Sequence, residues 1–463
     1  MPNPPHILLI NPWITDFAAF DLWSMPLGSL FLASLLREGG VAVTFIDCLE
    51  RSKEEAAASD RSSMNTNRYG TGKFLKSPIE KPEAYAEIPR TYYRYGIHPD
   101  DFRNRLSTVD RPDLIWLTSM MTYWHPGVQQ TSSALREAFP TTPIWLGGVY
   151  ARLCTEHARR FSGVDRVFTD AVARLPDLIE SVTGFRVKNN DAWQSFANFP
   201  PPALDLAPHK GYAPLLTGVG CPFRCPYCAS HLLQPRREKR GADAIYSEIM
   251  KWSSESDVRD FAFYDDALLL DAKDALWLVL EKIIREGVQV RFHTPNALHI
   301  RALTQEWCEL LHASGFTTLR LGLETISSEK QKQWGGKVET EMYLSAMGNL
   351  QNAGFTGREI GTYLLCGLPG QTPEEVSDAI ELVAGAGGQP FLAEYSPLPG
   401  TAMWEQARAA CRYDLDGEPL YHNNTFFACR RDDFAYDDLV ALKNKAMRAR
   451  RTVRDKCGAE ARG

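Results

Sequence analysis

The sequence has no long hydrophobic run and no strong excess of charge of either sign. No apolar stretch approaches the roughly 20 residues that a membrane-spanning helix needs. The amino-terminal stretch MPNPPHILLINP also lacks the basic start and long apolar core of a signal peptide. With 51 Lys and Arg against 57 Asp and Glu, the net charge of −6 gives no general reason to expect nucleic acid as a partner. These absences predict a cytoplasmic protein without a membrane span.

Cysteine is too sparse for a disulfide scaffold, since only 10 are spread over 463 residues. Without an export signal, reduced thiols are expected, and cysteines that stand close together then indicate metal or redox chemistry. The length predicts two or three domains. The composition, with 44% hydrophobic and 23% charged residues, is typical of a globular protein.

The first part of the chain alternates short apolar runs with helical patterns. This alternation predicts an α/β fold in which residues 1–185 form a doubly wound, Rossmann-like parallel sheet. A polar stretch, 51–95, interrupts the alternation and is expected to be an irregular insertion or a lid. No GxGxxG follows the first expected strand, which argues against a nicotinamide site. The expected strands are 6–10, 41–47, 113–119, 143–149 and 164–169.

A second alternation follows a proline-containing stretch, 186–212, which is expected to be a linker. Six strand–helix units in residues 213–404 predict a partial (β/α)6 barrel, in which chemistry takes place at the carboxyl ends of the strands. The tail, 405–463, is polar, and we expect a small helical extension there. The expected barrel strands are 214–219, 260–265, 290–295, 317–323, 359–366 and 391–396.

Three cysteines stand close together in the stretch GVGCPFRCPYCAS, residues 218–230. Cys221, Cys225 and Cys228 follow the first expected barrel strand, where active-site residues lie in such folds. One interpretation adds His231 to make a closed Cys3His zinc site. The other is an iron–sulfur cluster, in which three thiolates hold three irons and leave the fourth iron open to a ligand from outside the protein. The position at the barrel mouth favours the cluster.

The spacing CxxxCxxC, with the aromatic Tyr227 before the last cysteine, resembles the signature of the radical S-adenosylmethionine (radical SAM) superfamily. The resemblance implies a 4Fe–4S cluster whose open iron is chelated by the amino and carboxylate groups of SAM. An electron donor such as flavodoxin or ferredoxin would reduce the cluster. Reductive cleavage of SAM would then give a 5′-deoxyadenosyl radical that abstracts a hydrogen atom from the substrate. The protein would supply orientation and a dry cavity.

Two further stretches resemble the SAM-binding strands of this superfamily. FAFYDDALL, residues 261–269, ends the second barrel strand with Asp265 and Asp266 where the family usually has Gly-Gly-Glu. A carboxylate there can bind the SAM amino group, and a helix N-cap is the alternative. LRLGLET, residues 319–325, resembles the fourth strand, which makes Glu324 a SAM contact. A glutamate at a barrel mouth is costly to bury without a partner, which favours a ligand role.

The stretch TYLLCGLPGQT resembles the fifth strand and its Gly-Leu-Pro-Gly turn. Gly367, Pro369 and Gly370 are therefore predicted to let the backbone approach the adenosine closely. Cys366, just before the turn, is either a hydrogen-atom donor to a product radical or a small buried residue. AEYSPLPGT, residues 393–401, resembles the sixth strand.

Weaker candidates lie elsewhere in the barrel and the tail. Asn296 and His293 stand near the end of the third strand, where they either face the cofactor or make structural hydrogen bonds. Cys411, Cys429 and Cys457 are candidates for a second cluster, although their spacings are wide and irregular.

The first domain resembles the cobalamin-binding-type domain that precedes many radical SAM barrels. The matching stretches are MPLGSLFLASLLREGG, DLIWLTSMMTYWHPG and PIWLGGVYARL. The cobalt-ligating DxHxxG of mutase-type cobalamin domains is absent, so two alternatives stay open: a corrin site, or a corrin-free domain with a docking role. His125 follows a strand and either faces a ligand or packs at a helix start. Tyr123 and Trp124 either line a flat macrocycle or fill an interface.

Several functions remain compatible with the sequence. With cobalamin, the leading prediction is a radical methyltransferase that acts on a small molecule. Without it, rearrangement or carbon–sulfur chemistry is expected. A methylthiotransferase is disfavoured, because only Cys48 and Cys154 precede the linker and that family has three further cluster cysteines there. A structural-metal protein and an RNA-modifying enzyme, with the basic stretch 443–456 on phosphate, are the remaining alternatives.

Overall fold

The computed structural model describes residues 4–51, 68–207, 211–255, 258–334 and 336–460. The chain divides into two compact units. Unit 1 consists of residues 1–212 together with the short segment 416–422, and unit 2 of residues 213–415 and 423–463. Part of the insertion predicted in residues 51–95, namely 52–67, lies outside the described residues.

Unit 1 is built on a parallel sheet of five strands in the order β10-β9-β8-β1-β4. The chain passes from β1 to β4 on one side and then to β8 on the other, which makes the sheet doubly wound, as predicted. The carboxyl ends of β1 and β8 therefore flank the switch point of the topology. The strands are β1 (His6–Asn11), β4 (Ala42–Asp47), β8 (Leu114–Leu117), β9 (Ile144–Leu146) and β10 (Arg166–Val167).

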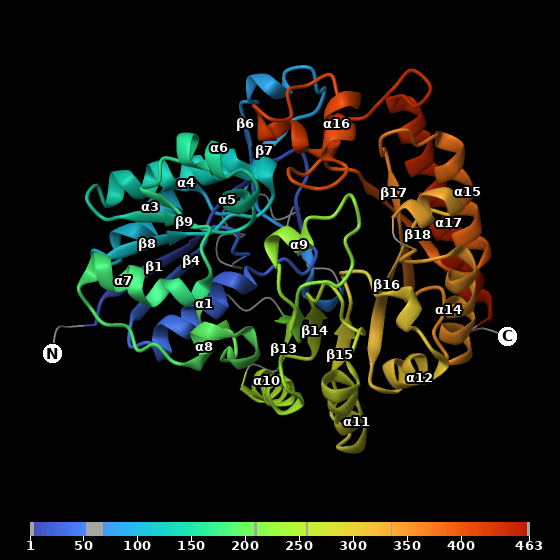
Figure 1. The fold of residues 1–463 in the computed structure, drawn as a ribbon, viewed down its shortest axis with the longest axis horizontal. Coiled ribbons are helices and arrows are strands. Elements are labelled where there is room, and N and C mark those ends of the chain that lie inside the picture. Colours follow the sequence, from blue (N-terminus) through green and yellow to red (C-terminus); the bar gives the residue numbers. More distant parts are fainter. Residues whose placement is uncertain (1–3, 52–67, 208–210, 256–257, 335, 461–463) are drawn as a thin grey trace. The chain divides into compact units, whose positions relative to one another are not determined.

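Helices cover both faces of this sheet (Figure 1). Alternate residues of β1 point to opposite sides: Leu8 and Ile10 join one apolar core, and Ile7 and Leu9 join the other. The first core is closed by α3 to α6 and the second by α1 and α7. The helices are α1 (Leu27–Glu38), α3 (Pro99–Ser107), α4 (His125–Ala138), α5 (Val149–Leu153), α6 (Thr155–Phe161), α7 (Leu175–Thr183) and α8 (Asp191–Gln194).

Two stretches of unit 1 are more ordered than the sequence suggested. In the predicted irregular insertion, β6 (Lys76–Ile79) and β7 (Tyr92–Tyr95) form an antiparallel sheet with β2 (Ile14–Asp16). A second, two-stranded antiparallel sheet pairs β3 (Phe20–Asp21), which precedes the insertion, with β5 (Gly72–Lys73), which lies inside it. The predicted linker is also wrong, because Trp193 and Ala203 are buried in the core beside α1 and α7. This proline-containing stretch packs on the sheet and is not a flexible connection between the two units.

Unit 2 contains the predicted partial barrel. Six parallel strands follow one another in sequence order, β11-β14-β15-β16-β17-β18. The carboxyl ends of the strands therefore share one edge, where barrel active sites lie. The strands are β11 (Ala213–Leu215), β14 (Asp260–Phe263), β15 (Arg291–His293), β16 (Phe316–Glu324), β17 (Ile360–Cys366) and β18 (Gln389–Glu394).

The first expected barrel strand is shorter than predicted. Residues 214–219 divide into β11 and a separate β12 (Gly218–Val219), which pairs antiparallel with β13 (Glu238–Lys239). The bend directs the chain into the cysteine stretch. The helices of unit 2 are α9 (Ser230–Leu233), α10 (Ala242–Glu255), α11 (Leu278–Arg285), α12 (Gln305–Ala313), α13 (Ser328–Gln333), α14 (Thr340–Asn352), α15 (Pro373–Gly385), α16 (Trp404–Ala410) and α17 (Tyr436–Glu460).

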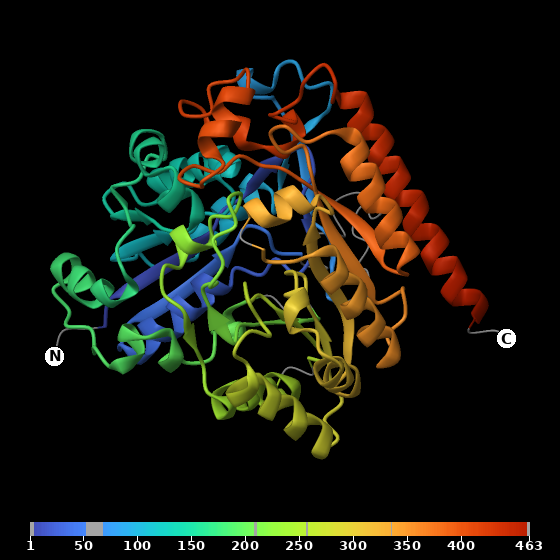
Figure 2. The ribbon, with the colours of Figure 1, turned by 45° about the vertical axis from the view of Figure 1, so that its right-hand side comes forward.

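The tail ends in α17, which packs along α15 and β18 (Figure 2). Basic side chains of α17 make this contact. Arg450 donates to the carbonyl of Pro390 at 2.9 Å, and Lys443 pairs with Glu394 at 2.9 Å. Neither α17 nor any other helix among the described residues combines the length and the apolar character needed to cross a membrane.

Candidate functional site

The cysteine loop begins directly after β12, at the carboxyl edge of the barrel sheet. We use the name cysteine loop for residues 221–228. Cys225 is buried, whereas Cys221 and Cys228 are partly exposed. The backbone amide of Cys228 donates to the carbonyl of Cys225 at 3.0 Å, which closes a turn between the last two cysteines. The three thiols are thus presented from one short loop at the predicted active edge.

Asp265 fixes the start of this loop. Its buried carboxylate accepts hydrogen bonds from the Thr217 amide at 3.1 Å, the Thr217 hydroxyl at 2.6 Å and the Gly218 amide at 2.7 Å. Burial raises the pKa of Asp265 to about 6, although these hydrogen bonds lower it. Through these hydrogen bonds Asp265 holds the bend between β11 and β12. This corrects both sequence readings of Asp265, as a ligand of the SAM amino group and as a helix cap.

The environment of the thiols suits a cluster better than a single ion. Among the residues that the structure describes, the three cysteines and His231 are not part of a group of side chains close enough to share one metal ion. Burial raises the pKa of Cys221 and of Cys225, and the nearby Lys337 ammonium opposes this shift in both thiols. A positive charge beside the loop stabilises thiolates, the form that binds iron.

Glu324, the last residue of β16, has a strained backbone. Its φ is +66°, in the left-handed region that a non-glycine residue enters at a cost of roughly 1–3 kcal/mol. The strand register also shifts between Gly322 and Glu324, which turns the carboxylate back over Gly322. A Cβ atom at Gly322 would lie 2.7 Å from Glu324 Oε1, so glycine leaves the room for this carboxylate. Such strain at a strand end is typical of a functional position.

The Glu324 carboxylate lies 3.5 Å from the Lys337 ammonium, and both side chains are largely buried. Burial raises the pKa of Glu324, and Lys337 opposes the shift. The pair lines a small pocket together with Cys225, Tyr227 and Trp334, whose ring meets that of Tyr227 edge-on at 5.4 Å. The pocket therefore joins the cysteine loop to the end of β16.

The remaining polar candidates differ in whether their side chains are free to contact a ligand or are already used in hydrogen bonds within the protein. Asp266 is exposed, hydrogen bonds to Ser230 and lies close enough to Cys221 to affect the thiol. Asn296 donates to the carbonyl of Tyr264 at 2.8 Å, which holds the end of β14. His293 is completely buried between Asp260 at 2.9 Å and Thr318 at 3.2 Å, so the structural alternative applies to it.

The Gly-Leu-Pro-Gly turn follows β17 and is held by Gln371, whose Oε1 accepts from the Gly367 amide at 2.8 Å. A Cβ atom at Gly367 would lie 2.5 Å from the ring of Phe427, so packing requires this glycine. Gly370 has a φ of +70° and open space beside its Cα. It is thus better placed than Gly367 for a close ligand approach. Cys366 is buried, which raises its pKa to about 12 and favours the packing alternative.

Sequence reasoning missed His299 and Lys337, which have no motif around them. The buried His299 ring stacks on Phe223 of the cysteine loop, with ring centroids 4.2 Å apart. Burial, with Lys337 and Arg301 nearby, lowers the pKa of His299 to about 3. The ring is therefore neutral at pH 7 and supports the loop by stacking.

This histidine gives a pH-dependent stability. The pKa of His299 is depressed in the folded state. The unfolded chain therefore binds a proton at His299 below about pH 6.5, whereas the folded chain binds it only below about pH 3. Stability should fall as the pH drops through this window, by on the order of 5 kcal/mol in total. His299→Phe, which keeps the stack, should flatten the dependence in chemical unfolding between pH 7 and 4. An equally steep curve in that variant would contradict the assignment, and His312→Phe, at an exposed histidine of α12, controls for the loss of a histidine as such.

A second candidate region lies at the carboxyl edge of the unit 1 sheet. The segment that joins β1 to α1 begins and ends at this edge and exposes Phe20 and Leu22, at 50% and 60%. The loop after β8 exposes Met121 at 42%. Large apolar side chains in solvent beside the switch point are typical of a ligand surface.

His125 does not extend this apolar surface. It is buried at the start of α4, where its Nε2 lies 3.0 Å from Glu418 Oε1. Tyr123 and Trp124 precede it in a short turn. Trp124 donates to Asp16 at 2.7 Å, and Tyr123 is buried. These aromatic residues therefore pack within unit 1.

The cysteines of the tail do not form a common site. Cys429 interacts with Tyr395, which follows the carboxyl end of β18, and with Cys411. Cys457 lies on α17 next to Gly357, which precedes the amino end of β17. The two locations are at opposite edges of the barrel sheet, which excludes a second cluster built from these three residues.

Residues 215–383 match the family model described as the radical SAM superfamily. This stretch of the chain is therefore a radical SAM domain. The matched range starts at the end of β11 and stops inside α15, so it contains the cysteine loop, Asp266 and Glu324. The enzyme class predicted from the three cysteines is thereby confirmed.

Two curated relatives share about a quarter of the aligned residues with this radical SAM enzyme. An uncharacterized methyltransferase of Pyrococcus horikoshii is 24% identical over 227 residues, which are 47% of this chain and 48% of the relative. A tRNA-2-methylthio-N(6)-dimethylallyladenosine synthase of Mycobacterium avium is 25% identical over 289 residues, 58% of this chain and 39% of the relative. The aligned regions thus span about half or less of these relatives.

Solved structures resemble both units at once. The radical SAM methyltransferase TsrM from Kitasatospora setae, with cobalamin and a 4Fe–4S cluster bound, matches 91% of this chain and 85% of its own at a TM-score of 0.64 and 15% identity. The cobalamin-dependent radical SAM enzyme OxsB matches 92% of this chain and 56% of its own at a TM-score of 0.55 and 14% identity. These likenesses confirm the predicted fold, a doubly wound parallel sheet followed by a partial (β/α)6 barrel.

Proposed function

We propose that this chain is a cobalamin-dependent radical SAM methyltransferase that acts on a small molecule. The observation that carries the proposal is the presence, in one chain, of the cysteine loop and of a doubly wound sheet whose switch point exposes apolar side chains. The fold shared with TsrM supports it, since structures of that methyltransferase hold cobalamin, a 4Fe–4S cluster, and tryptophan with a SAM analogue.

Cys221, Cys225 and Cys228 would hold a 4Fe–4S cluster. The donor set fits, because three thiols from one loop suit three irons and Lys337 offsets their negative charge. Such a cluster supplies the electron for reductive cleavage of SAM. Asp265 positions the loop through Thr217 and Gly218.

SAM would bind in the pocket between the cysteine loop and β16. Glu324 and Asp266 would accept hydrogen bonds from its cationic amino group, which are stronger than bonds between neutral partners. The open side of Gly370 would receive the adenosine. Tyr227 and Trp334 would exclude water from this end of the pocket.

Cobalamin would bind at the carboxyl edge of the unit 1 sheet, where Phe20, Leu22 and Met121 offer apolar contacts to a corrin face. The cobalt-ligating DxHxxG motif is absent, so the contacts that this sheet edge would offer to a corrin are the apolar ones. When bound, cobalamin would carry a methyl group from SAM to the substrate, and SAM would leave as S-adenosylhomocysteine.

The apolar surface gives a direct test of cobalamin binding. Met121→Asp or Leu22→Asp places a charge where a corrin face would be buried, and each should lower cobalamin affinity at least tenfold, about 1.4 kcal/mol. The iron content should not change. Cobalamin bound per chain can be measured by absorption after equilibrium dialysis of the anaerobically prepared protein.

Val182→Asp is the matched control. Val182 is also exposed in unit 1, but it lies at the end of α7 that faces the amino edge of the sheet. Equal cobalamin affinity in all three variants would contradict the proposed surface. Wild-type protein that binds no cobalamin would instead favour a corrin-free radical SAM enzyme for rearrangement or carbon–sulfur chemistry.

A nucleic-acid substrate is less well supported, although the Mycobacterium avium relative is named for tRNA modification. The basic helix α17 uses Lys445, Arg450 and Arg454 in contacts with Glu381, Pro390 and Gln389 of its own unit. These cations stabilise the packing of the helix, which leaves fewer of them for phosphate.

A further inference from the structure

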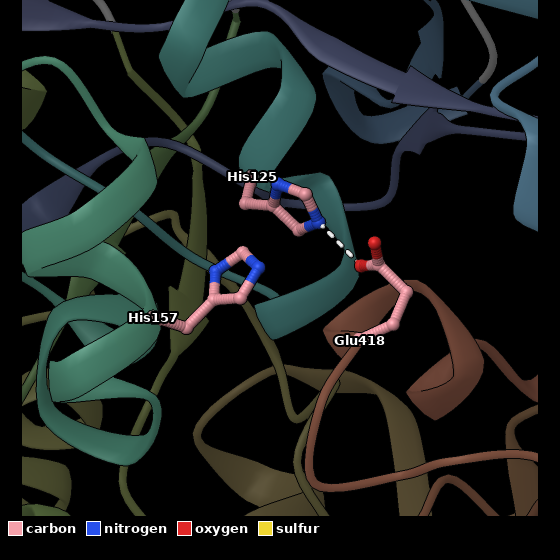
Figure 3. Close-up of side chains that lie close together, drawn as sticks. All are labelled: His125, His157 and Glu418. Atoms are coloured by element: carbon pink, nitrogen blue, oxygen red, sulfur yellow. Dashed lines mark hydrogen bonds and ion pairs between the residues drawn. The ribbon is translucent and has the colours of Figure 1, made fainter.

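Two histidines and a glutamate of unit 1 gather in a place that the proposed methyl transfer does not use (Figure 3). His125 begins α4, His157 lies in α6, and Glu418 belongs to the segment 416–422, which clusters with unit 1. We call these three residues the His–His–Glu cluster. Their ligand atoms all lie within 4.8 Å of one another, and within the described part of the chain they form the only such group of three.

The carboxylate is held in place before any ligand arrives. The hydroxyl of Tyr85 donates to the carbonyl of Leu420 at 3.2 Å, and His422 hydrogen bonds to Thr122 at 2.9 Å. The amide of Leu420 also donates to Glu418 Oε1 at 3.0 Å. The segment that carries Glu418 is thus anchored by the residues that follow it, Leu420 and His422, which lowers the ordering cost of binding.

The orientation of His157 is that of a metal ligand. Its Nδ1 lies 2.7 Å from the hydroxyl of the buried Tyr150, and its other ring nitrogen faces His125 and Glu418 in Figure 3. Metal-binding histidines almost always have such a partner on the nitrogen that does not coordinate, because it fixes the tautomer and the ring.

A simple hydrogen-bonded pair explains the arrangement incompletely. His125 Nε2 lies 3.0 Å from Glu418 Oε1, and this pair alone gives no reason for a second imidazole beside it. The ring centroid of His157 is 4.7 Å from that of His125. Burial, with His125 nearby, lowers the pKa of His157 to about 4, so this ring is neutral at pH 7 and can act as a ligand.

We propose that His125, His157 and Glu418 bind one divalent transition-metal ion, with Zn²⁺ as the ion to test. Two imidazole nitrogens and one carboxylate oxygen form the His2Glu set of open zinc sites and the facial triad of other divalent metals. Three protein ligands leave room for water. The ion tethers the 416–422 segment to α4 and α6. This site uses none of the residues of the proposed cluster, SAM or cobalamin sites.

Zinc binding to the full-length chain tests the proposal. Cys221, Cys225 and Cys228 are changed to serine in the background protein, so that zinc cannot bind to the cysteine loop. After treatment with a chelator and dialysis against Zn²⁺, the bound metal is counted by elemental analysis. We expect one zinc ion per chain in this background protein. We expect the same count in the wild type when its cysteines hold the iron–sulfur cluster. No bound zinc would overturn the proposal.

Variants assign the ion to the His–His–Glu cluster. Glu418→Gln keeps the shape and a hydrogen bond to His125, yet zinc affinity should fall by at least about 100-fold, since even outer-shell partners account for 10- to 100-fold. His157→Gln should lower zinc affinity by a similar factor. His98→Gln, at the exposed pair with Asp100, 3.2 Å apart, is the matched control and should bind as before. Unchanged affinity in Glu418→Gln and His157→Gln would also overturn the assignment.

Discussion

Replacing any one of Cys221, Cys225 and Cys228 by alanine is expected to reduce SAM turnover to the background rate. A cluster that keeps an open iron for SAM has only three protein ligands, so the loss of one thiolate leaves a second iron unheld. The iron content per chain should fall together with turnover. Turnover is measured by chromatography as 5′-deoxyadenosine or S-adenosylhomocysteine formed from SAM by the reduced protein.

Cys308→Ala is the control for these variants. Cys308 is fully buried in α12, and burial raises its pKa to about 12, so it is an inert packing residue of the same unit. This variant should keep its iron and its turnover. If one cysteine-loop variant retained SAM turnover at the wild-type rate, the three-cysteine cluster would be refuted.

Glu324→Gln is expected to weaken SAM binding by about 10- to 100-fold. The substitution keeps the size of the side chain but removes the charge that would meet the SAM ammonium, and a net hydrogen bond to a charged group is worth about 1.5–3 kcal/mol. Gly322→Ala should act in the same direction, because the added Cβ displaces the Glu324 carboxylate. Equilibrium dialysis of the cluster-loaded protein with labelled SAM measures the effect.

The control for the charge is Glu359→Gln. Glu359 precedes β17 at the opposite edge of the same sheet, where its carboxylate accepts from the Thr356 amide at 2.8 Å. SAM affinity should be unchanged in this variant. Wild-type affinity in Glu324→Gln would show that the strained backbone at Glu324 does not serve SAM, and Asp266 alone would then remain for the amino group.

The fold class was predictable from the sequence because continuous apolar strands with helices between them leave few topologies. Ile7 to Ile10 are apolar on both faces, which indicates a parallel sheet covered on both sides, and the structure has this sheet. The stretch 186–212 was not predictable. Its prolines suggest a linker, but Trp193 supplies apolar area that the sheet face needs to be covered.

The candidate site was predictable where a local motif exists. The spacing of the cysteines and the end of β16 lie in single stretches, so Cys221 and Glu324 could be named from the sequence. Lys337 and His299 could not, because they reach the cysteine loop only through the tertiary fold. Asp265 was misread for a related reason: the sequence shows a carboxylate at a strand end, but only the structure shows that Thr217 and Gly218 already occupy it.

The most direct test is an absorption spectrum combined with iron, sulfide and cobalt analysis. The full-length protein should be purified without oxygen from cells supplied with iron and cobalamin. We expect an iron–sulfur band with about four irons per chain, together with a corrin band and one cobalt. An iron–sulfur band without cobalt would contradict the cobalamin-dependent methyl transfer, and a protein without any iron–sulfur band would contradict the radical SAM mechanism itself.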